Sequence, residues 1–285
     1  MDITFWGVRG SVATSGPEVA QVGGSTSCVE VREGEHRLVF DAGTGIRALG
    51  NSLMARGGPC RLAVFFSHLH WDHLQGFPFF GPAYVPSTEL MLYGPGEKGD
   101  ARLAGALARQ MQPPSFPVTL EAMRGRLCFR SAEAGVPVEV GPFKVTPFAL
   151  PHPNGCMGYR VESQGAVFVY ATDVELSAGG ITPDILAGME GADALCMDAQ
   201  YTPEEYGAEG ARSKKGWGHS TMMDAAQIAR TVGARRLFLF HHDPSHDDAA
   251  VEAMAARARA HFPGAQPARE GMRVTLGDLP FTQVA

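Results

Sequence analysis

The sequence predicts an α/β fold in which two β-sheets pack face to face and helices cover their outer sides. Short β-like runs bounded by Gly and Pro recur in meandering order, and the few helical patterns follow the two halves of this strand series. No linker or low-complexity stretch divides the 285 residues. We therefore expect one domain over residues 1–285, built from two pseudo-symmetric halves.

The expected strands share a short apolar, β-branched or aromatic run that ends at a turn residue. They lie at residues 3–6, 28–31, 37–40, 62–66, 90–93, 143–148, 158–162, 166–170, 194–197 and 236–240. Helical spacing of apolar residues predicts helices at 45–54, 100–111, 221–232 and 249–261. The third helix has the clearest ends, because Thr221 can cap its first turn and Gly233 ends it.

Composition excludes several classes of protein. The chain is 45% hydrophobic and 19% charged, which supplies a large core and excludes wholesale disorder. A net charge of −6 without a long basic run argues against a protein that binds long nucleic acid through its phosphates. Five scattered cysteines without C-x-x-C spacing fit a reduced compartment. With no signal-like start and no apolar run of membrane-spanning length, we expect a cytoplasmic protein.

The most informative segment is residues 68–73, HLHWDH, directly after the apolar run 62–66. In extended backbone His68 and His70 project to the same side, and after a turn Asp72 and His73 can face the same space from the other flank. Such an arrangement suits two neighbouring divalent cations. The alternative, a coincidental polar loop, would leave three histidines and an aspartate crowded together without partners.

Further candidate ligands follow later strands. His152 lies between two prolines, which hold its backbone extended and suit a fixed ligand. Asp173 emerges from the strand at 166–170 and could bridge two metals with its two oxygens. His241 and His242 both follow the strand at 236–240. The alternatives are a solvent-facing loop histidine at His152 and a turn cap at Asp173.

This order of groups resembles the metallo-β-lactamase superfamily. An H-x-H-x-D-H element after a strand is followed by single candidates after three later strands, and residues 41–45, DAGTG, look like the family's loop beside the metals. The resemblance covers nearly the whole chain. It implies a metallo-β-lactamase-like αββα sandwich of two mixed sheets that holds two divalent metal ions. Imidazole-rich ligation favours Zn²⁺, and Mn²⁺ or iron would also fit.

The resemblance also implies which residues bind each metal. His68, His70 and His152 look like ligands of the first metal, Asp72, His73 and His241 look like ligands of the second, and Asp173 looks like the bridge. We prefer His241 to His242 because the family's last ligand directly follows the strand core. His242 stays open, as a ligand or as a substrate contact.

A second motif, residues 218–221 (GHST), indicates which branch of the superfamily the chain resembles. It resembles the histidine motif of ribonuclease Z and its phosphodiesterase relatives, where the histidine serves the reacting phosphate. Those relatives usually orient this histidine with a glutamate, whereas this chain has the shorter Asp198. We expect His219 to be the proton donor, Asp198 to orient it, and Asp72 to orient the attacking hydroxide. The alternative for His219 is a local hydrogen bond ahead of the helix cap.

The predicted substrate is a small phosphodiester, and a cyclic nucleotide fits best. The long basic arm of the tRNA-processing enzymes is not visible between His152 and Asp173 or over 177–191. Substrate contacts are predicted just before His219, although a solvated loop is equally compatible with the pattern. These candidates are Trp217, Lys215, Lys214 and Arg212. The resemblance further implies a homodimer.

Four alternatives remain. The same dimetal site would serve a ribonuclease Z-like RNA 3′-end nuclease that docks RNA through a partner. It would also serve a hydrolase of lactones, esters or thioesters, in which the pair His219 and Asp198 has less purpose. A redox di-iron protein would usually need a flavin partner domain, for which 285 residues leave no room. A degenerate nucleotide-binding sensor would be expected to lose ligands, whereas all seven positions are filled.

Overall fold

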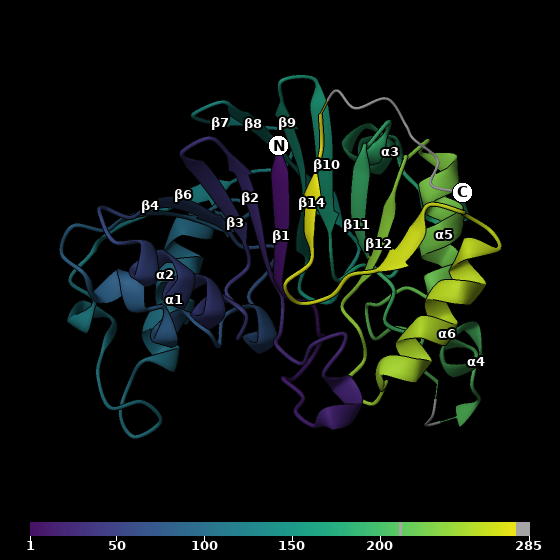
Figure 1. Ribbon diagram of the computed structural model, residues 1–285, viewed down its shortest axis with the longest axis horizontal. Helices are drawn as coiled ribbons and strands as arrows, with labels where there is room; N and C mark the ends of the chain where they lie inside the picture. The colour runs from purple at the N-terminus through teal and green to yellow at the C-terminus, as the bar shows by residue number, and fades with distance from the viewer. Residues whose placement is uncertain (211–212, 278–285) are drawn as a thin grey trace.

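Two seven-stranded sheets face each other in the computed structural model, which describes residues 1–210 and 213–277 (Figure 1). The first sheet has the order β14-β1-β2-β3-β4-β5-β6. Its strands are β14 (Arg273–Thr275), β1 (Asp2–Gly7), β2 (Cys28–Glu33), β3 (His36–Phe40), β4 (Arg61–Phe65), β5 (Glu89–Pro95) and β6 (Arg126–Ala132). Strands β14 to β3 pair antiparallel and β3 to β6 pair parallel.

The second sheet repeats this division into an antiparallel and a parallel part. Its order is β13-β12-β11-β10-β9-β8-β7. The strands are β13 (Ala265–Pro267), β12 (Leu237–Phe240), β11 (Ala194–Asp198), β10 (Ala166–Ala171), β9 (Cys156–Ser163), β8 (Phe143–Leu150) and β7 (Val138–Val140). Strands β7 to β10 pair antiparallel and β10 to β13 pair parallel, so both sheets are mixed as predicted.

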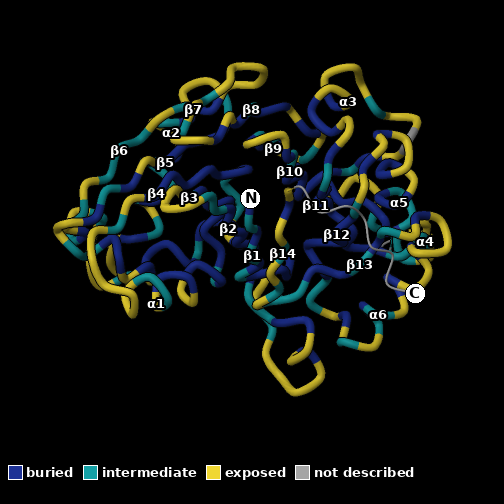
Figure 2. The backbone as a smooth tube through the Cα atoms, turned by 45° about the horizontal axis from the view of Figure 1, so that its top comes forward, coloured by how far each residue is buried: buried dark blue, intermediate teal, exposed yellow. Residues whose placement is uncertain are grey.

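Helices cover the outer faces of both sheets. Helices α1 (Ile46–Arg56) and α2 (Gly99–Gln110) pack on the first sheet. Helices α3 (Pro183–Met189), α5 (Met222–Thr231) and α6 (Asp248–Arg259) pack on the second, and α4 (Pro203–Tyr206) is a single turn. Figure 2 shows buried strands at the centre and exposed turns at the rim. The predicted αββα sandwich is confirmed.

An aromatic core joins the two sheets. Phe40 of the first sheet lies 5.4 Å from Tyr170 and 5.5 Å from Tyr159 of the second, measured between ring centroids. Phe65 and Tyr93 stack at 4.3 Å. Each such pair stabilises the fold by about 0.5–1.5 kcal/mol beyond its buried area. One core shared by both sheets agrees with the expected single domain over 1–285, which stays a prediction.

The helix that follows the His219 motif begins and ends as its sequence predicts. Thr221 caps α5 by accepting a hydrogen bond from the backbone of Asp224, and Gly233 beyond its end has φ of +66°. Because the cap fixes the start of α5, it also fixes the segment just before it, where His219 lies.

The elements that the sequence pattern did not predict are short or weakly apolar. Strand β6 is only partly buried along most of its length, and β7, β13 and β14 have three residues each. Helices α3 and α4 are too short to show helical periodicity. All five cysteines are free, and no helix in the described part of the chain is long and apolar enough to cross a membrane.

Candidate metal centre

Four chain segments deliver their polar side chains to one place, and each segment directly follows a strand. The segment 68–73 follows β4, His152 follows β8, Asp173 follows β10 and His241 follows β12. Asp173 and His241 have φ of 50° and 61°, a left-handed backbone that costs non-glycine residues roughly 1–3 kcal/mol. The surrounding fold stabilises this conformation, which turns both side chains into the site.

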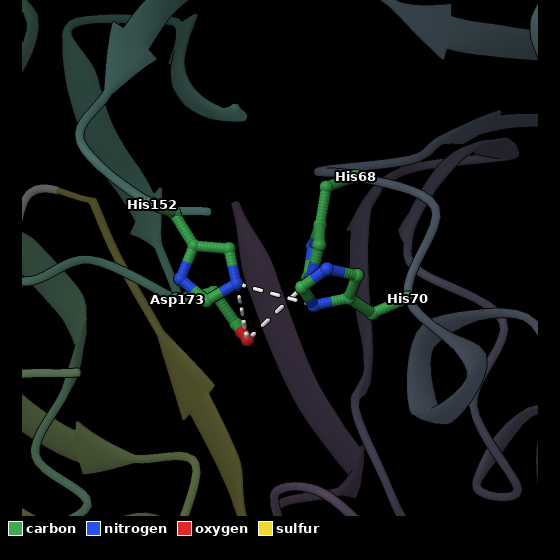
Figure 3. Close-up of side chains that lie close together, drawn as sticks. All are labelled: His68, His70, His152 and Asp173. Carbon is green, nitrogen blue, oxygen red and sulfur yellow. Dashed lines mark hydrogen bonds and ion pairs between the residues drawn. The ribbon is translucent and has the colours of Figure 1, made fainter. Parts of the chain in front are cut away.

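The first donor group contains three imidazoles and one carboxylate. One ligand atom from each of its members lies within 4.8 Å of the others, and the members are His68, His70, His152 and Asp173. Figure 3 shows the three imidazoles converging on Asp173. Oδ2 of Asp173 is 3.6 Å from Nε2 of His68 and 3.8 Å from Nε2 of His152.

The second donor group shares the same aspartate. Its members are Asp72, His73, Asp173 and His241, all buried. Here it is Oδ1 of Asp173 that lies 3.2 Å from Nε2 of His73 and 3.3 Å from Nε2 of His241. Because its two oxygens face different groups, Asp173 has the geometry of a bridge between two metal ions.

Divalent metal ions fit these two groups. Nε2 of His68 and Nε2 of His73 are buried and form no well-aligned hydrogen bond among the described residues, although Asp173 oxygens lie 3.6 Å and 3.2 Å away. A buried polar atom without an aligned partner is costly. Both atoms point into the donor groups and can serve as ligands. Imidazole and carboxylate donors together suit zinc and, with a mixed N/O set, manganese or iron.

Charge in the two groups also favours cations. Burial lowers the pKa of His68 well below its usual value, which keeps an uncharged lone pair available. Burial would raise the pKa of Asp72, but His73 and His241 outweigh it and hold that carboxyl ionised. At His73 burial opposes protonation, yet Asp173, Asp72 and Asp41 raise the pKa well above its usual value. A cation at the same place would meet the same carboxylates.

His219 and Asp198 form a separate pair beside the donor groups. Nδ1 of His219 lies 2.6 Å from Oδ2 of Asp198, and both residues are buried. The His219 ring centroid is 4.9 Å from that of His241 and 5.2 Å from that of His152. With His241 the pair forms a third group of metal-binding residue types. His219 and Asp198, however, already form a hydrogen bond with each other.

The Asp198 carboxylate sets the charge of His219. Burial alone would lower the pKa of His219, but the nearby carboxylates, Asp198 first among them, raise it to about 9. Asp198 also accepts hydrogen bonds from the backbone of Gln200, Ser220 and Val174, which fix its position. The shorter carboxylate therefore reaches the histidine and favours its protonated form.

Comparison with known proteins identifies the family. The sequence profile of the β-lactamase superfamily domain matches residues 36–242. The chain belongs to the metallo-β-lactamase superfamily. A ribonuclease Z of Salinibacter ruber is 30% identical, over 84% of this chain and 85% of its own length. The prediction of a metal-dependent hydrolase of this superfamily is confirmed.

Solved structures of the superfamily share the fold along nearly the whole chain. The metallo-β-lactamase fold protein YhfI from Bacillus subtilis superposes with a TM-score of 0.71 at 20% identity, covering 96% of this chain and 98% of YhfI. The human short form of tRNase Z superposes with a TM-score of 0.67 at 20% identity, covering 97% of this chain and all of that protein.

In this superfamily member, hydrogen bonds on the far side of two histidine rings fix which nitrogen faces the two donor groups. Nδ1 of His152 lies 2.7 Å from the carbonyl oxygen of Gly218, and Nδ1 of His241 lies 2.9 Å from Oε1 of Gln200. These partners orient the rings so that Nε2 faces the donor groups. The sequence pattern indicated neither contact, because the partners lie 66 and 41 positions away.

Asp41 is the most connected of these supporting groups. It accepts hydrogen bonds from the backbone and hydroxyl of Ser67 and from the hydroxyl of Tyr170, and it lies 2.7 Å from Nδ1 of His73. Asp41 directly follows the end of β3 and has a φ of 62°. The sequence predicted that the loop at residues 41–45 lies beside the metals. It did not predict the hydrogen bonds of Asp41, because these join residues from both sheets.

The loop before His219 is held by Glu175, which the sequence analysis did not single out. Its carboxylate accepts hydrogen bonds from the backbone of Gly216 and Gly218, at 2.8 Å each, and from the hydroxyl of Tyr206. The carbonyl oxygen of Gly218 accepts a hydrogen bond from Nδ1 of His152, and this contact connects the loop to the donor groups.

The predicted substrate contacts occupy different surroundings. Trp217 and Lys215 are exposed, and Nζ of Lys214 lies 4.4 Å from the Trp217 ring centroid and 5.5 Å from that of Tyr201. His242 is buried outside the donor groups, and its Nε2 is 3.0 Å from the carbonyl oxygen of Ala268. Arg212 lies outside the described residues.

Two cavities flank the metal centre. One has a volume of about 450 Å³ and is lined by His152, His219, Glu175 and Asp224, among others. The other has a volume of about 360 Å³ and is lined by residues that include His68, His70 and Arg102. His152 lines the first cavity and His70 the second, so each cavity borders an imidazole of the first donor group.

Proposed function

We propose that this protein is a dinuclear-metal-dependent phosphodiesterase that hydrolyses a small phosphodiester. The observation that carries the proposal is the His219–Asp198 pair, which places an imidazole backed by a carboxylate beside two complete donor groups. A phosphodiester needs both parts, because its negative charge repels a nucleophile and its leaving alkoxide needs a proton.

In this proposal seven residues hold the metals, His241 and not His242 among them. His68, His70 and His152 bind the first ion, Asp72, His73 and His241 bind the second, and Asp173 binds both. When bound, two such ions lower the pKa of a shared water and neutralise the phosphoryl oxygens. We assign Zn²⁺ as the resident metal because imidazoles predominate.

His219 has the role of general acid. Its Nδ1 donates to Asp198, which leaves Nε2 to transfer a proton to the departing oxygen. Asp198 keeps the imidazole protonated and oriented. Oδ2 of Asp72 accepts a hydrogen bond from the backbone N–H of Ser11, at 2.8 Å, and the same oxygen faces His241. This contact holds the carboxylate in place to orient the attacking water.

A small substrate, of which a cyclic nucleotide is our first choice, is supported by the local chain path. Strands β9 and β10 take up most of the chain between His152 and Asp173. In the described residues, 177–191 contains a single 3-10 turn, η6 (Ala178–Gly180), and helix α3. Together with the net charge of −6, these segments favour a substrate that fits the two cavities.

An RNA 3′-end nuclease is the second candidate. The relative from Salinibacter ruber is named ribonuclease Z, and its similarity extends over 84% of this chain. A lactone, ester or thioester hydrolase has less support, because the protonated His219 has no evident task in lactone opening.

The test is a panel of substrates for the zinc- or manganese-loaded protein, with bound metal counted on the same sample. The panel contains 3′,5′- and 2′,3′-cyclic nucleotides, bis(p-nitrophenyl) phosphate, a short RNA and a lactone. Turnover of a cyclic nucleotide that is lost with bound metal is the expected result. Cleavage of the RNA alone would establish the second candidate, and cleavage of the lactone alone would overturn the phosphodiesterase proposal.

A further inference from the structure

The two cavities beside the metal centre differ in charge. The cavity next to His219 includes two carboxylates in its lining, Glu175 and Asp224. The described lining of the cavity next to His68 and His70 has no carboxylate and includes one guanidinium, that of Arg102. Apart from His219 itself, the charged groups of the first lining are carboxylates, whereas the opposite lining offers a cation. An anionic group that extends away from His219 is therefore favoured on the side of Arg102.

Arg102 is available to a ligand. It is an exposed residue in the first turn of α2, and its guanidinium forms no ion pair or hydrogen bond within the described residues. A guanidinium presents five N–H donors in a planar fork that matches two oxygens of a phosphate. Arg102 lines the same cavity as His68 and His70 of the first donor group.

The backbone leaves this cavity open. Gly96 and Gly155, both in its lining, have φ of +73° and +81°. A Cβ at Gly155 would meet nothing within 4 Å, and one at Gly96 would touch only Cε of Met157, at 3.8 Å. The exposed side-chain amide of Asn154, 3.4 Å from Nε2 of His70, supplies a second polar group in the lining.

The position of His219 decides which part of a substrate occupies this cavity. If His219 protonates the leaving group, that group lies in the carboxylate-lined cavity, and the fragment that keeps the reacting phosphate extends toward Arg102. We propose that Arg102 binds a second phosphate, carried by this retained fragment of a small nucleotide. This inference rests on the proposed phosphodiesterase function and names its substrate class more narrowly, as an open-chain phosphodiester, since the opening of a cyclic nucleotide releases no separate fragment.

Two chromogenic substrates isolate the second phosphate. Thymidine 5′-(p-nitrophenyl phosphate) and its 3′-phosphorylated form release the same leaving group and differ only on the retained fragment. We expect the wild-type protein to prefer the 3′-phosphorylated form by roughly 10- to 100-fold in kcat/KM, mainly through KM. In Arg102→Ala this preference should fall to about one.

Arg109→Ala is the matched control, because Arg109 is an exposed arginine of the same helix outside the cavity lining. It should keep the preference of the wild type. Equal kcat/KM for both substrates in the wild type, or a preference that survives in Arg102→Ala, would overturn the inference and leave the phosphodiesterase function intact. Hydrolysis of neither substrate would instead count against the proposed function.

A competition experiment identifies the source of the second phosphate. Thymidine 3′,5′-bisphosphate should inhibit the wild-type protein at least as tightly as a short oligoribonucleotide does. Much tighter inhibition by the oligoribonucleotide would assign the Arg102 cavity to a neighbouring phosphate of an RNA chain and overturn the small-nucleotide proposal.

Discussion

The two flanks of the metal centre are held in different ways. On the flank that follows β4, the donors come from one short segment, and His73 lies against the fully buried Asp41. On the opposite flank, His219 lies between the buried Asp198 and a partly exposed loop whose backbone binds Glu175. Support on the first flank is buried and dense, whereas support on the second is partly open to solvent.

From this difference we expect that metal binding and the proposed proton donation are separate properties. Both donor groups are complete without His219, because neither contains it. His219 in turn takes its raised pKa chiefly from Asp198, which belongs to neither of the two groups that share Asp173. Changes on the two flanks should therefore have different effects on bound metal.

The largest effect is expected from His68→Ala. This change removes a buried ligand of the first group, so we expect loss of bound metal and a fall in kcat/KM of more than about 10,000-fold. Metal analysis and turnover on one sample measure both. His261→Ala, an exposed histidine, is the control and should retain both. Full metal content in His68→Ala would contradict the assignment.

His219→Ala should lower kcat by roughly a hundredfold to ten-thousandfold, since it removes the proton donor. Bound metal should stay at the wild-type level, because the two donor groups are untouched. A parallel loss of metal would show that the two flanks are not separable and that His219 is a ligand.

Asp41→Asn tests the support behind His73. The change weakens a network of hydrogen bonds from Ser67, Tyr170 and His73. Because the loss of such supporting contacts typically lowers metal affinity by about 10- to 100-fold, we expect a decrease of that size. A chelator competition at equilibrium measures the affinity. Unchanged affinity would mean that the ring of His73 is fixed by packing alone.

The pH dependence of the reaction tests Asp198. In the proposed mechanism the protonated form of His219 is the active one, so activity should fall as pH rises through its pKa. The falling limb should lie no higher than about 9, because bound cations lower that pKa. Asp198→Asn removes the first cause that raises the pKa, and the limb should move to lower pH by roughly one to three units. An unmoved limb would assign it to another group.

The sequence predicted the segment 68–73, because neighbouring residues after a strand end can face the same space. It also predicted the single candidates His152, Asp173 and His241, because each directly follows a later strand. It could not predict Asp41 with His73, Gln200 with His241 or Glu175 with the loop before His219, because each contact joins positions far apart in the chain. Helix ends were predictable where local chemistry decides them, as at Thr221.

Three predictions concern properties that lie outside the fold of one chain. The homodimer implied by family resemblance, the cytoplasmic location and the zinc identity stay predictions. Trp217 and Lys215, the predicted substrate contacts, are both exposed, so neither the pattern nor the fold selects the base that a nucleotide substrate would carry.

The most direct test of the central claim compares leaving groups in wild type and His219→Ala, with bound metal counted in both proteins. A nucleoside p-nitrophenyl phosphodiester releases a phenolate that needs little protonation, whereas the matched methyl ester releases an alkoxide that needs a proton. We predict that His219→Ala keeps its metal, loses roughly a hundredfold or more on the methyl ester, and loses far less on the p-nitrophenyl ester. Equal losses on the two esters, or loss of metal, would contradict the account.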